Sequence, residues 1–420
     1  MLDIKRIREE PDAVRKGIEA KGSEPELVDQ ALGFDTRVRE LKTETEILRA
    51  EQRTKSKDFG KLKKEGADVE ALQNELNQLK ANISGNNDEL TKLEDELKGV
   101  LDLMPNVPHA DMPPGKDAED NVEVSQWGDI PKHENALPHW DIGARYGLEI
   151  ERGSKMSGSG FPMLIGPYAK LERALAQFFI DTHTQKNGYT EVYCPFLVRA
   201  HAMYASGQLP KAAGEQYHTE RDDLYLIPTA ETPLTNIHAD EIFAESDLPK
   251  RYTSYTYCFR REAGAAGSDT RGLIRMHQFT KVEMMEYVHP NKSYEVLETL
   301  TRNAEKLLEE LELPYRKLNV CSGDSTLTNT KQYDLEVYSI GVQRWLEVSS
   351  CSNFEDFQSR RAKIRYKDSE TGKNEFVHTL NGSGLATSRI LVSLVENNQQ
   401  ADGSVNIPKA LQDYYGGDKL

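Results

Sequence analysis

Apolar residues in the first hundred positions recur every three or four residues in two series. The second series is Val69, Leu72, Leu76, Leu79, Ile83, Leu90, Leu93, Leu97 and Val100, interrupted by Asn86 and Asn87. The first, weaker series is Phe34, Val38, Leu41 and Leu48, with Thr45 and Gln52 at the same spacing. This spacing predicts coiled-coil helices. Because a charged stretch with two glycines, 58–68, separates the series, we predict an antiparallel helical hairpin over residues 34–100. Its helices would be about 50 Å long.

Charge is unevenly distributed along this hairpin, which we call the arm. The stretch 49–64 has a net charge of +5, whereas 65–98 has a net charge of −6. Its basic residues are Arg49, Arg53, Lys55, Lys57, Lys61, Lys63 and Lys64. They either keep a coiled coil in solution or contact a phosphate backbone. The chain's total charge of −16 does not exclude nucleic acid, because binding depends on local patches.

The remainder of the chain has a different organisation. Residues 104–121 are rich in proline and acidic residues, which predicts a linker between an N-terminal domain, 1–103, and a larger domain, 122–420. In the larger domain, strand and helix patterns mix without regular alternation, which favours the α+β class. Neither G-x-G-x-x-G nor G-x-x-x-x-G-K-[ST] occurs, so a nucleotide site here would use neither a Rossmann fold nor a P-loop.

Three stretches of the larger domain carry candidate chemistry. In the first, 167–187 has helical apolar spacing, and after Gly188 a strand runs into Pro195. In the second, 252–288, a strand ends in Phe259-Arg260-Arg261-Glu262, and a loop with Gly264, Gly267 and Asp269 leads to a second strand. Arg260 and Glu262, two apart, would face the same side, so one could hold a phosphate while the other accepts a hydrogen bond. A salt-bridged surface hairpin is the alternative.

The third stretch, 376–397, is predicted as a strand, a turn at Asn381-Gly382-Ser383-Gly384, and a helix that carries Arg389. Glycines allow close backbone approach to a ligand, and a helix N-terminus favours an anion. A plain strand-to-helix turn is the alternative here.

Together the three stretches resemble class II aminoacyl-tRNA synthetases, whose catalytic domain is an antiparallel β-sheet flanked by helices. Pro195 matches the motif 1 proline of the dimer interface, Phe259–Glu262 matches motif 2, and the glycine-rich turn with Arg389 matches motif 3. The stretches 228–231, 259–283, 347–361 and 378–386 resemble seryl-tRNA synthetases almost continuously. The long helical hairpin is similar to that family's tRNA-binding arm.

The resemblance implies roles for individual residues. The catalytic residues would be Arg260, Glu262 and Arg389. Serine would be bound by Thr229, Ala230, Glu231, Arg260, Glu283 and Ser383. ATP would be bound by Arg260, Arg261, Glu262, Met276, Phe279, Glu347, Val348, Ser349, Ser350 and Arg389, and Mg²⁺ by Glu347 and Ser350. The tRNA would contact the basic residues of the arm and Arg271.

The implied reaction is activation of L-serine by ATP to seryl-adenylate, followed by transfer to the 3′ end of tRNA(Ser) and also of tRNA(Sec). The implied assembly is a homodimer. Two residues depart from the family pattern: Arg261, which we expect to point away from the nucleotide, and Ser268, which leaves Arg271 as the main cation of its loop. Both departures bear on contacts with tRNA more than on adenylate formation.

Other features limit the cofactors and the compartment. The four cysteines are far apart and form no zinc-binding or disulfide pattern, so we expect no zinc. No long apolar run and no secretory signal are evident, so we expect no membrane partner and a cytoplasmic protein.

Three alternatives compete with this interpretation. Another class II synthetase would usually carry a C-terminal anticodon-binding domain, for which the 31 residues after Arg389 are too few. A synthetase-like protein that charges a different acceptor would have no need of a basic arm. A coiled-coil scaffold without catalysis would not retain every residue assigned to ATP.

Overall fold

A computed structural model describes residues 1–262 and 271–420 of the chain. Gly264, Gly267, Ser268 and Asp269, named above, lie outside the described residues. The chain divides into two compact units, Met1–Pro105 and Asn106–Leu420. The predicted linker residue Asn106 donates hydrogen bonds from its side chain to the carbonyls of Thr328 and Phe354, within the second unit. Among the described residues, no helix combines the length and apolar character needed to cross a membrane.

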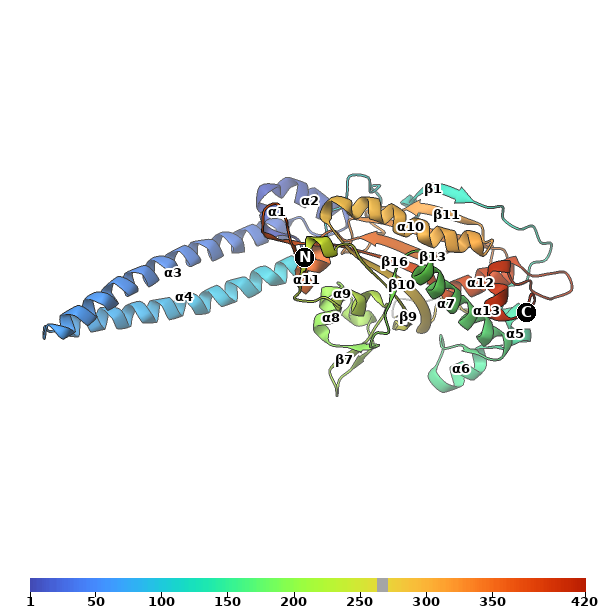
Figure 1. The fold of residues 1–420 in the computed structure, drawn as a ribbon, viewed down its shortest axis with the longest axis horizontal. Coiled ribbons are helices and arrows are strands. Elements are labelled where there is room, and N and C mark those ends of the chain that lie inside the picture. The colour runs from blue at the N-terminus through green and yellow to red at the C-terminus, as the bar shows by residue number, and fades with distance from the viewer. Residues whose placement is uncertain (263–270) are drawn as a thin grey trace. The chain divides into compact units, whose positions relative to one another are not determined.

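The first unit is helical. Its helices are α1 (Ile4–Glu9), α2 (Pro11–Ala20), α3 (Glu26–Lys64) and α4 (Glu70–Leu103). As Figure 1 shows, α3 and α4 lie side by side as a long hairpin. The predicted seam is confirmed, since Leu41 and Leu79 are buried in it. Helix α3 continues through Gly60 to Lys64, so the break between the helices is shorter than predicted. A single glycine inside a helix costs only about 1 kcal/mol.

Polar contacts between α3 and α4 fix how the two helices align. Arg49 donates from Nη2 to Oδ1 of Asn87 at 3.0 Å, and Lys55 Nζ lies 2.6 Å from Oε2 of Glu75. Two of the seven predicted tRNA-contacting residues of the arm are therefore also paired with the return helix. Lys57, Lys61 and Lys64 are exposed, and within the described part of the chain none of them forms an ion pair.

The second unit is built on an eight-stranded sheet in the order β1-β11-β12-β13-β16-β10-β9-β4. Its strands are β1 (Val122–Trp127), β4 (Thr190–Glu191), β9 (Lys250–Phe259), β10 (Gln278–Val288), β11 (Tyr315–Asn319), β12 (Lys331–Ser339), β13 (Arg344–Asn353) and β16 (His378–Ala386). All neighbours are antiparallel except β4 and β9, as predicted for the class II core.

Helices cover both faces of this sheet. The long helices α7 (Pro167–Gln185), α10 (Ser293–Glu310) and α12 (Thr387–Asn397) pack on one face and bury the main apolar core, with α5 (His139–Tyr146) and α13 (Lys409–Tyr415) beside them. The short helices α8 (Ala200–Ala205), α9 (Glu231–Asn236) and α11 (Phe357–Ala362) contribute a smaller cluster on the other face.

Short elements complete the unit. They are β2 (Leu148–Glu149), α6 (Ile150–Ser157), β3 (Met163–Leu164), β5 (Leu197–Val198), β6 (His218–Thr219), β7 (Leu224–Leu226), β8 (Ile242–Ala244), β14 (Arg365–Lys367) and β15 (Asn374–Phe376). They form three small sheets, β2-β3, β5-β7-β6 and β15-β14-β8.

Two neighbouring strands of the large sheet each contain one extra residue. In β13, Ser349 pairs with Leu335 and Glu347 with Glu336, so Val348 is extra. In β16, Ser383 pairs with Glu283 and Ala386 with Lys281, so two residues of β16 face one of β10. Because side chains alternate along a strand, such a bulge brings residues three apart onto the same face.

The β16 bulge replaces the turn that we predicted at 381–384, and that prediction was wrong. The strand continues to Ala386, and α12 begins at Thr387. The glycines serve packing instead, because a Cβ on Gly382 would lie 2.3 Å from Leu300 and one on Gly384 2.6 Å from His183. Leu385 adopts a left-handed φ of 84°, which is rare for a residue other than glycine.

Candidate active site

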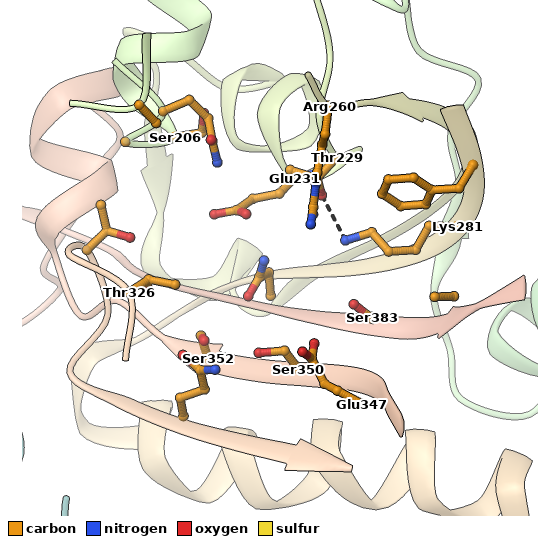
Figure 2. Close-up of a pocket in the computed structure, with 18 of the residues that line it drawn as sticks. Ser206, Thr229, Glu231, Arg260, Lys281, Thr326, Glu347, Ser350, Ser352 and Ser383 are labelled. Atoms are coloured by element: carbon orange, nitrogen blue, oxygen red, sulfur yellow. Dashed lines mark hydrogen bonds between the residues drawn. The ribbon is translucent and has the colours of Figure 1, made fainter. Parts of the chain in front are cut away.

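A cavity of about 670 Å³ opens on the face of the sheet opposite the long helices. Eleven of the residues predicted to bind serine, ATP or Mg²⁺ line it: Thr229, Glu231, Arg260, Glu262, Met276, Phe279, Glu347, Val348, Ser350, Ser383 and Arg389. Figure 2 shows Arg260, Thr229, Glu231 and Lys281 opposite Glu347, Ser350 and Ser352, with Ser383 between the two groups. The structure thus brings together residues that are up to 160 positions apart in the sequence.

One wall of the cavity is a buried polar cluster around Thr229. The Thr229 hydroxyl donates to Oε2 of Glu283 at 2.8 Å and accepts from Nζ of Lys281 at 3.0 Å. Lys281 also forms an ion pair with Glu283. The second carboxylate oxygen of Glu283, Oε1, is buried and has no hydrogen-bond partner among the described residues. An acceptor left in that state is costly, so the cluster is suited to bind a donor from a ligand.

Glu231 is the second carboxylate of this wall. Its Oε1 accepts from Nε2 of Gln358 at 2.6 Å, and Gln358 is oriented by the Thr379 hydroxyl at 2.8 Å. Burial raises the pKa of Glu231 to about 7, and the neighbouring charge of Glu283 contributes in the same direction. Glu231 therefore changes its charge near neutral pH, and a cation bound beside it would favour the ionised form.

The opposite wall of the cavity, on β13, presents carboxylate and hydroxyl oxygen atoms. The β13 bulge at Val348 places Glu347 and Ser350 on the same face, although they are three residues apart. Beneath them lies Asp334, which accepts from Nε2 of Gln332 at 2.9 Å. Burial raises the pKa of Asp334 well above its usual value, and the charge of Glu347 raises it further. Carboxylate and hydroxyl oxygens are the ligands that Mg²⁺ prefers.

Cations and one aromatic ring form the end of the cavity nearest β9 and β10. The Arg260 guanidinium lies over the Phe279 ring, 5.1 Å from its centroid, in a cation–π contact. Glu262, with a left-handed φ of 50°, accepts a hydrogen bond from Arg275 Nε. An arginine beside a half-buried aromatic ring can hold a phosphate while the ring packs against a base.

Arg389 joins the two walls. Its Nη1 donates to the Glu347 carbonyl at 2.6 Å, and its Nε donates to the Ile274 carbonyl at 3.4 Å. The same Nη1 lies 3.5 Å from Oε2 of Glu347. Arg389 therefore contacts both the wall on which Mg²⁺ was predicted to bind and the segment around Ile274.

Four of the residues predicted to bind serine or ATP do not line the cavity, and neither does Arg271, which was predicted to contact tRNA. Ala230 and Glu283 are buried behind it, and the Ser349 hydroxyl donates to the Ser383 carbonyl at 2.6 Å, within the core. Arg261 is exposed and outside the cavity lining. Arg271 lies over the Trp140 ring, 4.5 Å from its centroid. The roles assigned to these residues stay predictions.

The sequence reasoning assigned no role to Lys281, Arg275, Asn381 or Ser352, all of which line the cavity. A signal was available for Lys281, because it lies between Phe279 and Glu283 at the alternating spacing of one strand face. The same spacing relates Ser352 to Ser350 and Asn381 to Ser383, since neither pair spans a bulge. The turn predicted at 381–384 hid this signal for Asn381.

All four cysteines are buried free thiols, and none lines the cavity. Burial raises the pKa of Cys351 to about 12, which leaves almost no thiolate at neutral pH. In the residues that the structure describes, no cluster of three or more His, Cys, Asp or Glu side chains is arranged to hold a metal ion.

Comparisons with known proteins cover the whole chain. The family model described as "tRNA synthetase class II core domain (G, H, P, S and T)" matches residues 215–398, and "Seryl-tRNA synthetase N-terminal domain" matches residues 1–108. Serine--tRNA ligase of Pseudothermotoga lettingae is 46% identical over 424 residues, covering 100% of both chains. That of Nitratidesulfovibrio vulgaris is 48% identical over 420 residues, covering 99% of each chain.

Solved structures agree with the sequence comparisons. Seryl-tRNA synthetase from Pyrococcus horikoshii complexed with ATP superposes with a TM-score of 0.94 at 37% identity, over 100% of this chain and 99% of that chain. The fold and the arm are therefore those of one family from end to end. The chain belongs to the seryl-tRNA synthetase family of class II aminoacyl-tRNA synthetases.

Proposed function

We propose that this protein is a serine–tRNA ligase, which activates L-serine with ATP and transfers it to the 3′ end of tRNA(Ser). The observation that carries the proposal is that Thr229, Glu231, Arg260, Glu347 and Arg389 line the same cavity in a member of this family. In the first step, the serine carboxylate attacks the α-phosphorus of ATP and pyrophosphate leaves. In the second, a ribose hydroxyl of the tRNA attacks the seryl carbonyl and AMP leaves.

Serine fits the buried polar wall. Its ammonium group would be held by the carboxylate of Glu231, while Glu283, behind the lining, would orient the Thr229 hydroxyl. Its hydroxyl would lie near Ser383, and its carboxylate near Arg260. A site that hydrogen-bonds a hydroxyl leaves its own polar groups unpaired when alanine binds, so it discriminates strongly against alanine.

ATP fits the remainder of the cavity. The adenine would stack on Phe279 with Arg389 over its other face, and Arg260 would contact the α-phosphate. Glu347 and Ser350 would hold Mg²⁺ on the phosphates, where the ion neutralises negative charge. The side chains of this chain then catalyse by position and charge: Arg260 stabilises the charge that develops on the α-phosphate, and no side chain acts as a covalent nucleophile.

The arm is proposed to bind the tRNA through its phosphate backbone. Lys57, Lys61 and Lys64 are exposed near the end of α3, where the net charge of the helix is positive. Contacts of this kind read the shape of an RNA more than its sequence. We extend the proposal to tRNA(Sec), whose charging is measured in the same assay as that of tRNA(Ser).

The first prediction concerns the activity. Pyrophosphate exchange into ATP should depend on serine, and threonine, alanine and cysteine should give at most a few per cent of that rate. A version lacking residues 34–100 should keep the exchange and lose tRNA charging, because the cavity lies wholly in the second unit. If the folded full-length protein bound ATP but catalysed no exchange with any of these amino acids, the scaffold or a different acceptor would be the better interpretation.

The second prediction concerns assembly, which we propose to be a homodimer. Pro195 is flanked by Tyr193, whose side chain is 90% exposed, and by Leu197, which is 47% exposed. Such an exposed apolar surface is typical of an interface. In sedimentation velocity, the protein should be a dimer and Tyr193→Asp should shift it toward monomer. Met156→Asp, at an exposed apolar residue of α6, should remain dimeric. A monomeric unmodified protein would refute the dimer.

The third prediction follows from the raised pKa of Glu231. Below about pH 7 the Glu231 carboxyl of the free protein is protonated and carries no charge for the serine ammonium. The KM for serine should therefore rise about tenfold per pH unit as the pH falls below 7. Glu231→Gln should have a higher KM that does not change between about pH 6 and pH 8, whereas the exposed Glu220→Gln should behave like the unmodified protein. A serine KM that stays constant over this range would exclude Glu231 as the ammonium ligand.

A further inference from the structure

A buried histidine–glutamate pair lies outside the cavity and is used by none of the steps above. His139 opens α5, Glu396 lies near the end of α12, and both are fully buried. The His139 Nδ1 lies 2.8 Å from Oε1 of Glu396, and the backbone N–H of His139 donates to the same oxygen at 2.8 Å. The carboxylate thus also accepts one of the N–H groups that a helix leaves unpaired at its start.

Both oxygen atoms of the Glu396 carboxylate accept hydrogen bonds. Its other oxygen, Oε2, accepts from the Ser339 hydroxyl, from the Gly341 N–H at 2.9 Å and from the Val342 N–H at 3.1 Å. Burial alone would raise the pKa of Glu396, but the hydrogen bonds from His139 and Ser339 bring it below its usual value. Because Glu396 is ionised and accepts only, the Nδ1 of His139 must carry the hydrogen.

The tautomer of His139 determines what its other nitrogen does. With the hydrogen on Nδ1, Nε2 is an acceptor, and the backbone N–H of Leu273 donates to it at 3.0 Å. The approach is close enough to require glycine at the preceding position, since a Cβ on Gly272 would lie 2.0 Å from Nε2. Gly272 also has a left-handed φ of 77°. The geometry at this point is thus specific for a histidine facing a glycine.

Leu273 starts the segment that forms one wall of the nucleotide cavity. The next three residues, Ile274, Arg275 and Met276, line the cavity. The same helix, α12, holds this segment twice: Arg389 donates to the Ile274 carbonyl at 3.4 Å, and Glu396 acts through His139 on the Leu273 N–H. Under the proposed function Arg389 turns to ATP, and the hydrogen bond that His139 accepts from the Leu273 N–H remains in place.

We propose that His139 and Glu396 are positioning residues that hold the segment Leu273–Met276 in place for ATP, and this inference rests on the proposed function. His139 touches neither ATP nor serine. It acts through the Leu273 N–H, and Glu396 acts by orienting His139. Among the described residues, no hydrogen bond joins this chain to the serine wall around Thr229, so the pair should affect ATP binding and leave serine binding unchanged.

Two substitutions of His139 test the roles of its two ring nitrogens one at a time. In His139→Asn, the side-chain amide can reach the position of Nδ1 and bond to Glu396, but Leu273 loses its acceptor. In His139→Gln, the amide reaches the position of Nε2 and can still accept from Leu273. The KM for ATP in pyrophosphate exchange should rise about 10-fold in His139→Asn and less than about 3-fold in His139→Gln, because a buried donor without a partner is costly. The KM for serine should stay within about 2-fold of the unmodified value in both variants.

A purely structural role would give a different result. It would reduce the folded fraction and the apparent kcat of both variants alike, without a selective change in the KM for ATP. Equal ATP KM values in the two variants, or equal increases for ATP and serine, would overturn the proposal. If His139→Asn did not fold, Ser339→Ala would take its place, since Ser339 bonds to Glu396 and does not line the cavity. It should raise the ATP KM about 3-fold, and an unchanged KM would count against the proposal.

Direct ATP binding separates this inference from the proposed function. Titration calorimetry with ATP and Mg²⁺ measures affinity without any chemistry. If the unmodified protein bound ATP but catalysed no exchange, the proposed function would fail, and the ratio of ATP affinities of the two His139 variants would still decide the positioning role. If the exchange were normal and the two affinities were equal, only the positioning role would fail.

Discussion

The active-site cavity depends on one constraint of strand geometry, the alternation of side chains between the two faces of a sheet. In a regular strand, Glu347 and Ser350 would lie on opposite faces, and so would Ser383 and Ala386. One extra residue in β13 and one in β16 bring each pair onto the cavity face. The left-handed φ of Leu385 costs about 1–2 kcal/mol, which the packing of its buried side chain offsets.

The second requirement is that the charges gathered in this cavity compensate one another. Glu283 is stabilised by Lys281 and Thr229, Glu262 by Arg275, and Glu347 by Arg389. Glu283 is fully buried, so loss of its partners would be strongly destabilising, whereas Glu347 is exposed and its contact with Arg389 is one that a substrate can replace. Under the proposed function, Arg389 leaves Glu347 and contacts ATP when the nucleotide binds. The His139–Glu396 pair complements this exchange, because its hydrogen bonds persist when those of Arg389 change.

Much of this could be predicted from the sequence. The coiled-coil seam followed from the spacing of Leu72 to Val100, and the motif stretches identified the family and eleven of the residues that line the cavity. The bulges could not be predicted, because a glycine pair such as Gly382 and Gly384 is equally typical of a turn. His139 and Glu396 could not be related either, since they are 257 positions apart and each has an ordinary sequence context. Pairings at long range depend on packing, which local patterns do not encode.

The most direct test of this account is the crystal structure of the protein with ATP and Mn²⁺, whose anomalous signal locates the ion. The account predicts that the ion lies between the Glu347 carboxylate, the Ser350 hydroxyl and the ATP phosphates. It also predicts that the adenine lies on Phe279 and that the Leu273 N–H remains on His139. An ion bound away from Glu347 and Ser350, or a nucleotide outside this cavity, would contradict the account.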